Sequence, residues 1–482
     1  MVLLGGAVNI IPSLQYSLPV GSKFVYGLTD MYYSCLGGDS RWDGNNNGII
    51  GECGVDNISY IPTVAVSRIP IRSVNQLKSY IRKVIQYETH PHAEGDSIRM
   101  LIAGDSAHWK RNNESDAQFN SQWLAENIHS QFDNVSTGIL CDTRNDFDQL
   151  EPDTAISATN LVELIDSHHP HWLNMYCHGD VDRWILRPED FSVIHAASLN
   201  NSPTPMIVTT VACFTSLYSE YTPSLAEIMV NNSNGGALAY WGSSYEGIGD
   251  GQPGSIGPSM MLIDSFWNAL STDNRFGESV SWAKLQYAAR GNIGNERYDF
   301  LLKSMNPLGD CELPIYTEKP KEFSNIRVWF DYSDIHFEHD DGLTNWRAAY
   351  ESKYDNGEKY FSVGTGDDYE YFVLNQGSVP CTFCLTKKNY IPFIAETGRY
   401  VGTEANNDLY LQNIEYDSNE YIYNVDNDVF IGDSVDEESC QGNVVISSGA
   451  TVNIDFEHRA VIQSGFRCLK GGRLTFNYDY LD

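Results

Sequence analysis

A histidine and a cysteine in the middle of the chain each follow directly after a short apolar segment. His178 follows residues 171–177, and Cys213 follows residues 206–212. Both segments have the length of a buried parallel strand. Since the carboxyl ends of parallel strands meet at one edge of a sheet, a thiol and an imidazole at these two positions can lie together there. Such a pair supports nucleophilic catalysis by cysteine, although a buried structural thiol and a loop histidine fit the same pattern.

The region up to about residue 316 alternates apolar and amphipathic segments, which predicts an α/β architecture with a largely parallel open sheet and helices on both faces. In the helix expected over residues 73–88, Val74, Leu77, Ile81, Val84 and Ile85 fall on one face, which we expect to be buried. The other expected elements are strands at residues 1–4, 99–103, 172–177, 206–212 and 236–241, and helices at residues 116–132 and 161–165.

The pattern changes after about residue 317 to tyrosine-rich alternation with Gly, Asp and Asn turns, which is typical of antiparallel β structure. A helix is expected only around residues 345–354. The last segment repeats a short strand followed by a glycine turn. The expected division is therefore an N-terminal α/β subdomain at 1–95, a catalytic subdomain at 96–316, a β-rich domain at 317–435 and a small stacked β module at 436–482.

The formal net charge of −33, from 31 Lys and Arg against 64 Asp and Glu, argues against nucleic acid as a partner. No apolar run is long enough to span a membrane, and no self-pairing motif indicates an oligomeric state. The ten cysteines are scattered, and Cys381 and Cys384 are expected to be packing residues of a strand. The chain opens on an apolar strand without a recognisable signal peptide, which we interpret as a processed or truncated N-terminus.

Several segments together resemble the gingipain-like cysteine peptidases, which have a caspase-like fold, and the resemblance covers nearly all of residues 1–316. The segments NMYCHGDVDRW and MIVTTVACFTSLYS resemble the family's histidine and nucleophile strands, and GGALAYWGSS resembles its pocket-wall strand. The segment NPLGDCELPIY is similar to the family's closing segment, although Cys311 stands where proline is usual. The motifs occur in the family's order.

The resemblance implies that Cys213 is the nucleophile and that His178 is its general acid and base. It also implies that Asp105 orients the imidazole, for which the alternative is a turn-capping aspartate. The backbone N–H groups of Cys213 and Gly179, which both follow strand ends, are the expected oxyanion donors. No cofactor is expected for catalysis.

A preference for cleavage after arginine, or less strongly lysine, is implied at Asp116, which matches an acidic residue of the family's specificity pocket. A carboxylate binds a guanidinium through two parallel hydrogen bonds. The alternative is that Ser115 and Asp116 only cap a helix. Tyr245 or Trp241 is expected to cover the aliphatic stem of the substrate, beside Ser243 and Ser244.

The segment DGNNNGIIGE places Asp43, Asn45 and Asn47 at alternate positions, as in the first half of a calcium-binding loop. The twelfth position is Gly54 rather than glutamate. The resemblance implies related loops in the family in which another acidic residue completes the shell, here Glu52 or Asp56. With the carbonyl of Ile49, these residues form a possible structural calcium site, and an Asn-rich turn is the alternative.

The sequence thus predicts a cysteine endopeptidase that acts on proteins or peptides through a thioester acyl-enzyme. We expect it to work outside the cytoplasm, in the extracellular space, the periplasm or at the cell surface. The alternative is an inactive peptidase-like scaffold that serves binding or adhesion through its C-terminal β region. The resemblance by itself does not prove turnover.

Overall fold

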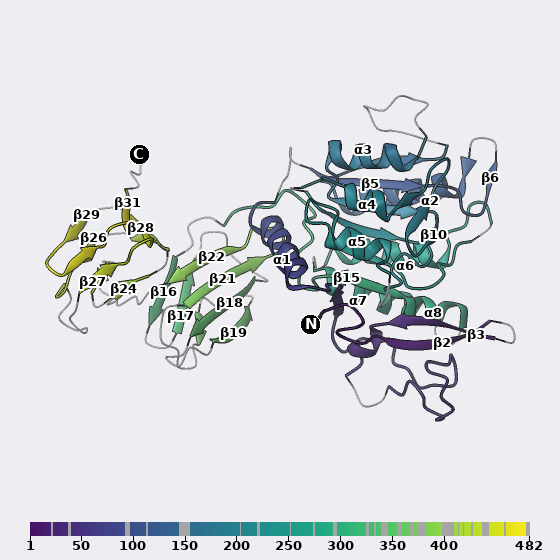
Figure 1. Ribbon diagram of the computed structural model, residues 1–482, viewed down its shortest axis with the longest axis horizontal. Coiled ribbons are helices and arrows are strands. Elements are labelled where there is room, and N and C mark those ends of the chain that lie inside the picture. Colours follow the sequence, from purple (N-terminus) through teal and green to yellow (C-terminus); the bar gives the residue numbers. More distant parts are fainter. Residues whose placement is uncertain are drawn as a thin grey trace. The chain divides into compact units, whose positions relative to one another are not determined.

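The structure is a computed structural model of the 482-residue chain, shown in Figure 1. It divides into two compact units, Met1–Pro320 and Lys321–Asp482, and each is described by itself. The described residues are all of 1–482 except 21–22, 37–39, 92–96, 112–113, 144–154, 203, 219–221, 251, 273–274, 293–295, 324–326, 332–333, 339–345, 354–358, 367–370, 374–380, 398–408, 413, 418, 426–427, 436–442, 457–458 and 479–482.

An eight-stranded sheet forms the centre of the first unit (Figure 1). Neighbouring strands run parallel, except that β14 and β15 are antiparallel. The carboxyl ends of β14, β13, β9, β5 and β8 therefore lie along one edge. In spatial order the strands are β1 (Val2–Gly5), β4 (Val66–Ile69), β15 (Met305–Gly309), β14 (Ala237–Ser243), β13 (Met206–Thr210), β9 (Trp172–Tyr176), β5 (Ile98–Gly104) and β8 (Val135–Cys141).

Two groups of helices flank this sheet, which confirms the predicted α/β architecture. In one group α1 (Val74–Thr89) contacts α5 (Leu225–Asn231), which contacts α4 (Val193–Ser198), which contacts α3 (Ala158–His168). In the other, α2 (Asp116–Gln131) contacts α6 (Pro258–Ala269), which contacts α7 (Phe276–Tyr287). The helix α8 (Glu296–Ser304) packs on β14 and β15.

The remaining elements of the first unit are short. They are the hairpin β2 (Leu14–Val20) and β3 (Lys23–Thr29), the 3-10 helix η1 (Met31–Ser34), the pair β6 (Lys110–Arg111) and β7 (Glu114–Ser115), the small sheet β10 (His178–Asp180), β11 (Arg183–Ile185) and β12 (Phe191–Ser192), and the π-helical turn η2 (Ala288–Asn292). Among the described residues, no helix is both long enough and apolar enough to cross a bilayer.

The buried face of α1 differs from the predicted one. Val74, Ile81 and Ile85 are 67%, 44% and 54% exposed, so the prediction was wrong for these residues. The face that packs on the core carries longer side chains with polar ends, and its buried residues are Tyr80, Lys83, Val84 and Tyr87.

Backbone acceptors explain why polar-tipped side chains of α1 are buried. The Tyr80 hydroxyl donates to the carbonyl of Leu238 at 2.8 Å. The Lys83 ammonium donates to carbonyls of residues 230, 232, 235 and 237 at 2.7 to 3.1 Å. A buried polar group that finds such partners avoids most of its desolvation cost. Apolar periodicity alone carries no signal for this arrangement.

The second unit consists of β-strands. Antiparallel sheets come first, and residues 346–353 form a strand where a helix was expected, so that expectation was wrong; Asn345 and Tyr354 lie outside the described residues. One sheet contains β16 (Arg327–Asp331), β17 (Asp334–Glu338) and β20 (Tyr371–Val373), and the other contains β19 (Lys359–Gly366), β18 (Trp346–Lys353), β21 (Cys381–Lys387) and β22 (Phe393–Thr397).

Parallel strands stacked in three short sheets follow, and they begin at residue 409 rather than at the predicted 436. They enclose an apolar core of their own. The sheets are β23 (Leu409–Leu411), β26 (Asp428–Ile431) and β29 (Arg459–Ile462); β24 (Ile414–Tyr416), β27 (Val444–Ile446) and β30 (Phe466–Cys468); and β25 (Glu420–Val425), β28 (Thr451–Phe456) and β31 (Arg473–Tyr478).

Candidate active site

Cys213 lies in the turn that follows β13. The hydroxyl of Thr210, the last residue of this strand, donates to a β9 carbonyl at 2.9 Å and accepts from the N–H of Ala212 at 3.0 Å. Phe214 has φ 60°, a left-handed conformation that is strained for a residue other than glycine. Its N–H donates to the carbonyl of Tyr245 at 2.7 Å. These bonds turn the chain sharply and hold the thiol at the edge where the parallel strands end.

The thiol of Cys213 is half-buried and has backbone donors around it. Its Sγ accepts a hydrogen bond from the N–H of Gly247 at 3.3 Å. Burial raises the pKa of the Cys213 thiol, and the N–H groups of Gly247, Gly179 and Cys213 itself offset only part of this increase. The carboxylate of Glu246 raises the pKa further. The thiol is therefore protonated at neutral pH unless an imidazole takes its proton.

His178 is the first residue of β10, directly after β9, and its side chain is exposed. Gly179 follows it. A Cβ atom at position 179 would lie 2.6 Å from the carbonyl oxygen of Cys213 and 3.1 Å from its nitrogen. Only glycine allows two backbones to approach so closely. The structure thus brings together the segments that carry His178 and Cys213, and the roles of the two side chains stay predictions.

Asp105 lies after β5, as expected, but its carboxylate is engaged away from His178. It is 1% exposed and accepts hydrogen bonds from the Arg187 backbone N–H at 2.6 Å and from the Arg187 guanidinium at 2.7 and 3.2 Å. A buried carboxylate needs such a counter-charge. Within the described part of the chain, no hydrogen bond joins Asp105 to His178. The predicted orienting role of Asp105 is not supported.

Asp116 is the first residue of α2 and is 1% exposed. Its carboxylate accepts from the N–H of Ala107, from the N–H of His108 at 2.7 Å and from the hydroxyl of Tyr176 at 3.2 Å. The helix cap is Ser115, whose hydroxyl accepts from the N–H of Gln118 at 3.1 Å. Ser115 therefore caps the helix, whereas the Asp116 carboxylate connects the segment after β5 to the end of β9 through hydrogen bonds.

A second carboxylate, that of Asp250, acts on Tyr176. Burial raises the pKa of the Tyr176 hydroxyl, and the charges of Asp116 and Asp250 raise it further. Asp250 belongs to the glycine-rich segment 247–257 that follows β14. Glu246 acts on the Cys213 thiol, so three carboxylates influence groups at this end of the sheet, and the guanidinium of Arg187, on which Asp116 also acts, lies near them.

The predicted pocket-wall residues separate into buried and accessible ones. Trp241 is 0% exposed, and its indole N–H donates to the Met305 carbonyl at 3.3 Å. Ser243 and Ser244 are also 0% exposed. These three residues belong to the core, so the expectation that they contact substrate is not supported. Tyr245 is half-buried and lies edge-on to Phe214, with ring centroids 5.3 Å apart, so it borders the turn that carries Cys213.

In the loop at residues 43–52, side-chain oxygens that could bind a metal ion accept hydrogen bonds from other residues of the loop. The Asp43 carboxylate accepts from the N–H groups of Asn47 and Gly48, and the Asn47 side-chain oxygen accepts from the N–H of Ile49. The Glu52 carboxylate accepts from the side-chain amides of Asn45 and Asn47 at 3.3 and 2.7 Å. All of these potential metal ligands are oxygen atoms, which suits a hard cation. No described group of three His, Cys, Asp or Glu residues is arranged to hold a metal ion.

The sequence did not single out two residues that the structure places at the site. His108 lies beside His178, and Tyr176 binds Asp116. Their position in the chain could have identified them, since each lies at the carboxyl end of a sheet strand or in the segment after it. Nothing in their residue types distinguished them from loop or core residues.

Comparisons with known proteins agree with this geometry. The family model of peptidase family C25 matches residues 1–316. Two similar solved structures are the Arg-specific cysteine proteinase gingipain R (18% identity, TM-score 0.57, covering 81% of this chain and 82% of that one) and the complex of Porphyromonas gingivalis RgpB pro- and mature domains (17%, 0.57, 82% and 84%). At these identities the likeness establishes the fold. A comparison with curated protein sequences gives no match.

Proposed function

Because the chain belongs to peptidase family C25, a family of cysteine peptidases, we propose that it is an active endopeptidase that uses Cys213 and His178. The observation that carries the proposal is the close approach of the two backbones at Gly179. His178 removes the thiol proton, and the thiolate attacks the peptide carbonyl carbon. His178 then protonates the leaving amine and activates the water that hydrolyses the thioester. No observation favours the inactive alternative.

The oxyanion donors in this mechanism are the N–H groups of Gly179 and Cys213. Both lower the pKa of the Cys213 thiol, which indicates that both lie close to the reacting sulfur. Donors fixed by the backbone need no reorganisation when negative charge develops on the carbonyl oxygen. The N–H of Gly247 contacts the sulfur itself and stabilises the thiolate.

The experiment compares Cys213→Ala and His178→Ala with wild type on a protein substrate. Each change removes one partner of the proton transfer, so peptide hydrolysis falls by about a thousandfold or more. Cys468→Ala is the control, because this thiol is exposed on β30. Hydrolysis by either dyad variant at more than a few per cent of the wild-type rate contradicts the proposal.

The proposed specificity is for arginine, and less strongly for lysine, on the acyl side of the cleaved bond. Asp116, Asp250 and Glu246 support it, because their charges act on groups at this end of the sheet. A guanidinium that reaches Asp116 gains charge-assisted hydrogen bonds in a site with little water. Tyr245 is the accessible aromatic residue that can cover its stem.

A fluorogenic peptide library tests this specificity on wild type, Asp116→Asn and the control Glu114→Gln, an exposed residue just before α2. The Asn variant keeps a carbonyl oxygen for the N–H donors but loses the charge. We expect kcat/KM for arginyl substrates to fall by about tenfold or more, and that for neutral substrates to change less. A wild-type preference for acidic or aliphatic residues, or an unaltered profile in the Asn variant, contradicts the assignment.

The proposal includes a structural calcium ion in the loop at residues 43–52. Asp43, Asn45, Asn47, Glu52 and the carbonyl of Ile49 would hold it, and their all-oxygen chemistry supports this choice. The ion would cross-link the loop and has no part in the reaction. We further propose, from family membership, that the protein acts outside the cytoplasm.

A further inference from the structure

A second imidazole lies against that of His178. The rings of His108 and His178 have centroids 6.1 Å apart and planes at 71°, an edge-to-face contact. Both side chains are exposed at the edge where the parallel strands end. Contacts of this geometry favour one relative orientation of two rings. His108 is therefore placed to influence which way the His178 ring points.

The backbone at His108 is fixed by a buried carboxylate. Asp116 accepts from the N–H groups of residues 107 and 108 and from the hydroxyl of Tyr176, the last residue of β9. His178 begins β10 shortly after Tyr176. The Asp116 carboxylate thus connects the segment that carries His108 to the strand that leads to His178. The backbone positions of the two histidines are therefore linked through one side chain.

The His108 ring also contacts the segment that reaches the thiol. A side chain at position 249 would collide with Nε2 of His108, so the backbone of Gly249 lies directly against this ring. Gly247, in the same segment, donates its N–H to the Cys213 Sγ. The His108 ring therefore contacts both the ring of the proposed base and the segment that reaches the proposed nucleophile.

We propose that His108 is a positioning residue for the proposed dyad, and that its ring holds the His178 imidazole in the orientation that faces Cys213. A third group normally fixes the imidazole of such a pair. The carboxylate of Asp105 is bound to Arg187, whereas His108 touches the ring directly. The inference rests on the function proposed above.

The test compares His108→Ala, which removes the ring, with His108→Phe, which keeps an aromatic edge without ring nitrogens. His129→Ala is the matched control, because His129 lies on α2 and binds Thr137. Each variant is measured for kcat and KM with a peptide substrate and for the rate of Cys213 alkylation by iodoacetamide. Thermal melting of each variant reports on folding.

In His108→Ala we expect kcat and the alkylation rate to fall by about tenfold or more, because general base catalysis is lost when the base is misdirected. KM changes by less than about twofold, since substrate contacts stay. His108→Phe recovers at least about half of both rates, and His129→Ala matches wild type.

Two results overturn the inference: a His108→Ala variant that equals His129→Ala, or a His108→Phe variant as slow as His108→Ala. If His108→Ala fails to fold, the Phe variant decides the question, and rates below about half of wild type count against the role. His178→Ala distinguishes a failure of the proposed dyad from a failure of the role proposed for His108. If it slows neither reaction, the dyad itself is wrong; if it slows both while His108→Ala slows neither, only the role of His108 is wrong.

Discussion

At the scale of single residues, the surroundings of Cys213 hold its thiol in the protonated form. Burial and Glu246 raise the pKa of this thiol, and three backbone N–H groups counter them only in part. In the proposed mechanism, the reactive thiolate therefore forms together with an imidazolium on His178. This dependence on one partner is why the removal of His178 is expected to be nearly as damaging as the removal of Cys213.

Glu88 on α1 gives a second residue-scale prediction. Burial, together with the charges of Asp310 and Glu312, raises the pKa of the Glu88 carboxyl to about 7. The folded chain then binds more protons than the unfolded chain between about pH 4.5 and 7. The stability that this carboxyl contributes is complete below that window and is lost as pH rises through it.

We therefore expect Glu88→Gln to be more stable than wild type at pH 8, by about 1 to 3 kcal/mol, and nearly equal to it at pH 5. Urea unfolding at the two pH values measures the difference. Glu126→Gln, an exposed change on α2, should give no such pH dependence. A difference between Glu88→Gln and wild type that is the same at both pH values would falsify the assignment.

The sequence placed the segments of His178 and Cys213 at neighbouring strand ends, as the structure has them, but it predicted the surroundings of these residues poorly, for one physical reason. His178 and Cys213 directly follow apolar strands, so local pattern and sheet topology suffice to bring them together. The partner of Asp105 is Arg187, which comes from beyond β11 and has no local relation to it. Trp241 was expected, as the alternative to Tyr245, to cover a substrate side chain, but it lies in the core, because burial of one strand residue depends on the layers that cover it.

At the scale of elements, the approach of β10 to the turn after β13 is the feature that makes the site. We expect Gly179→Ala to lower peptide hydrolysis by about tenfold or more, because the new Cβ pushes against the Cys213 backbone. Assays of hydrolysis beside thermal melting measure this. Gly5→Ala is the control, since a Cβ at Gly5 meets nothing within 4 Å. Equal activity of the two variants would show that the approach is not needed.

The loop at residues 43–52 provides the prediction about calcium. If the loop binds the ion in the folded state only, excess calcium stabilises the chain by about 2.7 kcal/mol at one hundred times the dissociation constant. We expect chelator to lower the melting temperature of wild type and to leave that of Asp43→Ala unchanged. The effect falls on stability rather than on the rate of hydrolysis. Identical melting of wild type with chelator and with excess calcium would refute the site.

The sequence predicted where the strands and helices lie along the chain better than it predicted which of their faces are buried. The strands β5, β9, β13 and β14 lie close to the predicted segments, because continuous apolar runs mark buried parallel strands. On α1 three residues of the predicted apolar stripe, Val74, Ile81 and Ile85, are exposed. Tyr80 and Lys83 are buried instead, since they find backbone acceptors in the core. Residues 346–353 form a strand because their neighbours pair with them on both sides, which no local propensity encodes.

At the scale of the molecule, strands from distant parts of the first unit share one sheet. The strand β15 joins β14 to β4, so β1 and β4 of the segment 1–95 belong to the same sheet as strands of 96–316. Such long-range pairing was not visible in the sequence. In the second unit, the stacked strands begin at residue 409 because Leu409 and Leu411 pair in register with Val429 and Ile431 of the next layer.

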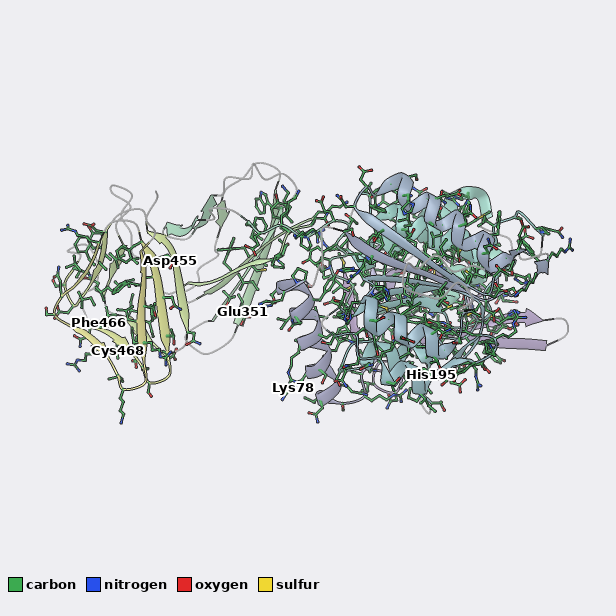
Figure 2. The ribbon with its side chains drawn as sticks, turned by 90° about the horizontal axis from the view of Figure 1, so that it is seen from above. Lys78, His195, Glu351, Asp455, Phe466 and Cys468 are labelled. Atoms are coloured by element: carbon green, nitrogen blue, oxygen red, sulfur yellow. The ribbon has the colours of Figure 1, made fainter. Side chains whose placement is uncertain are left out.

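The outermost layer of these stacked strands differs in charge from the rest of the chain. Figure 2 shows Phe466 and Cys468 on β30, and the described strand residues near them carry exposed Arg459, Arg467 and Arg473. Over residues 459–478 the sequence has no Asp or Glu, although the whole chain carries 64 acidic residues. The segment thus carries a local excess of positive charge, part of which Asp428 offsets through its ion pair with Arg459.

The most direct test of the central claim is covalent labelling of the full chain with a peptide chloromethyl ketone that ends in arginine, followed by digestion and mass spectrometry. The account predicts one adduct, on Cys213, that forms in wild type, is strongly slowed in His178→Ala and is absent in Cys213→Ala. The exposed Cys468 serves as the internal control for nonspecific alkylation. Labelling of Cys213 no faster than that of Cys468, or hydrolysis that survives complete labelling of Cys213, would contradict the account.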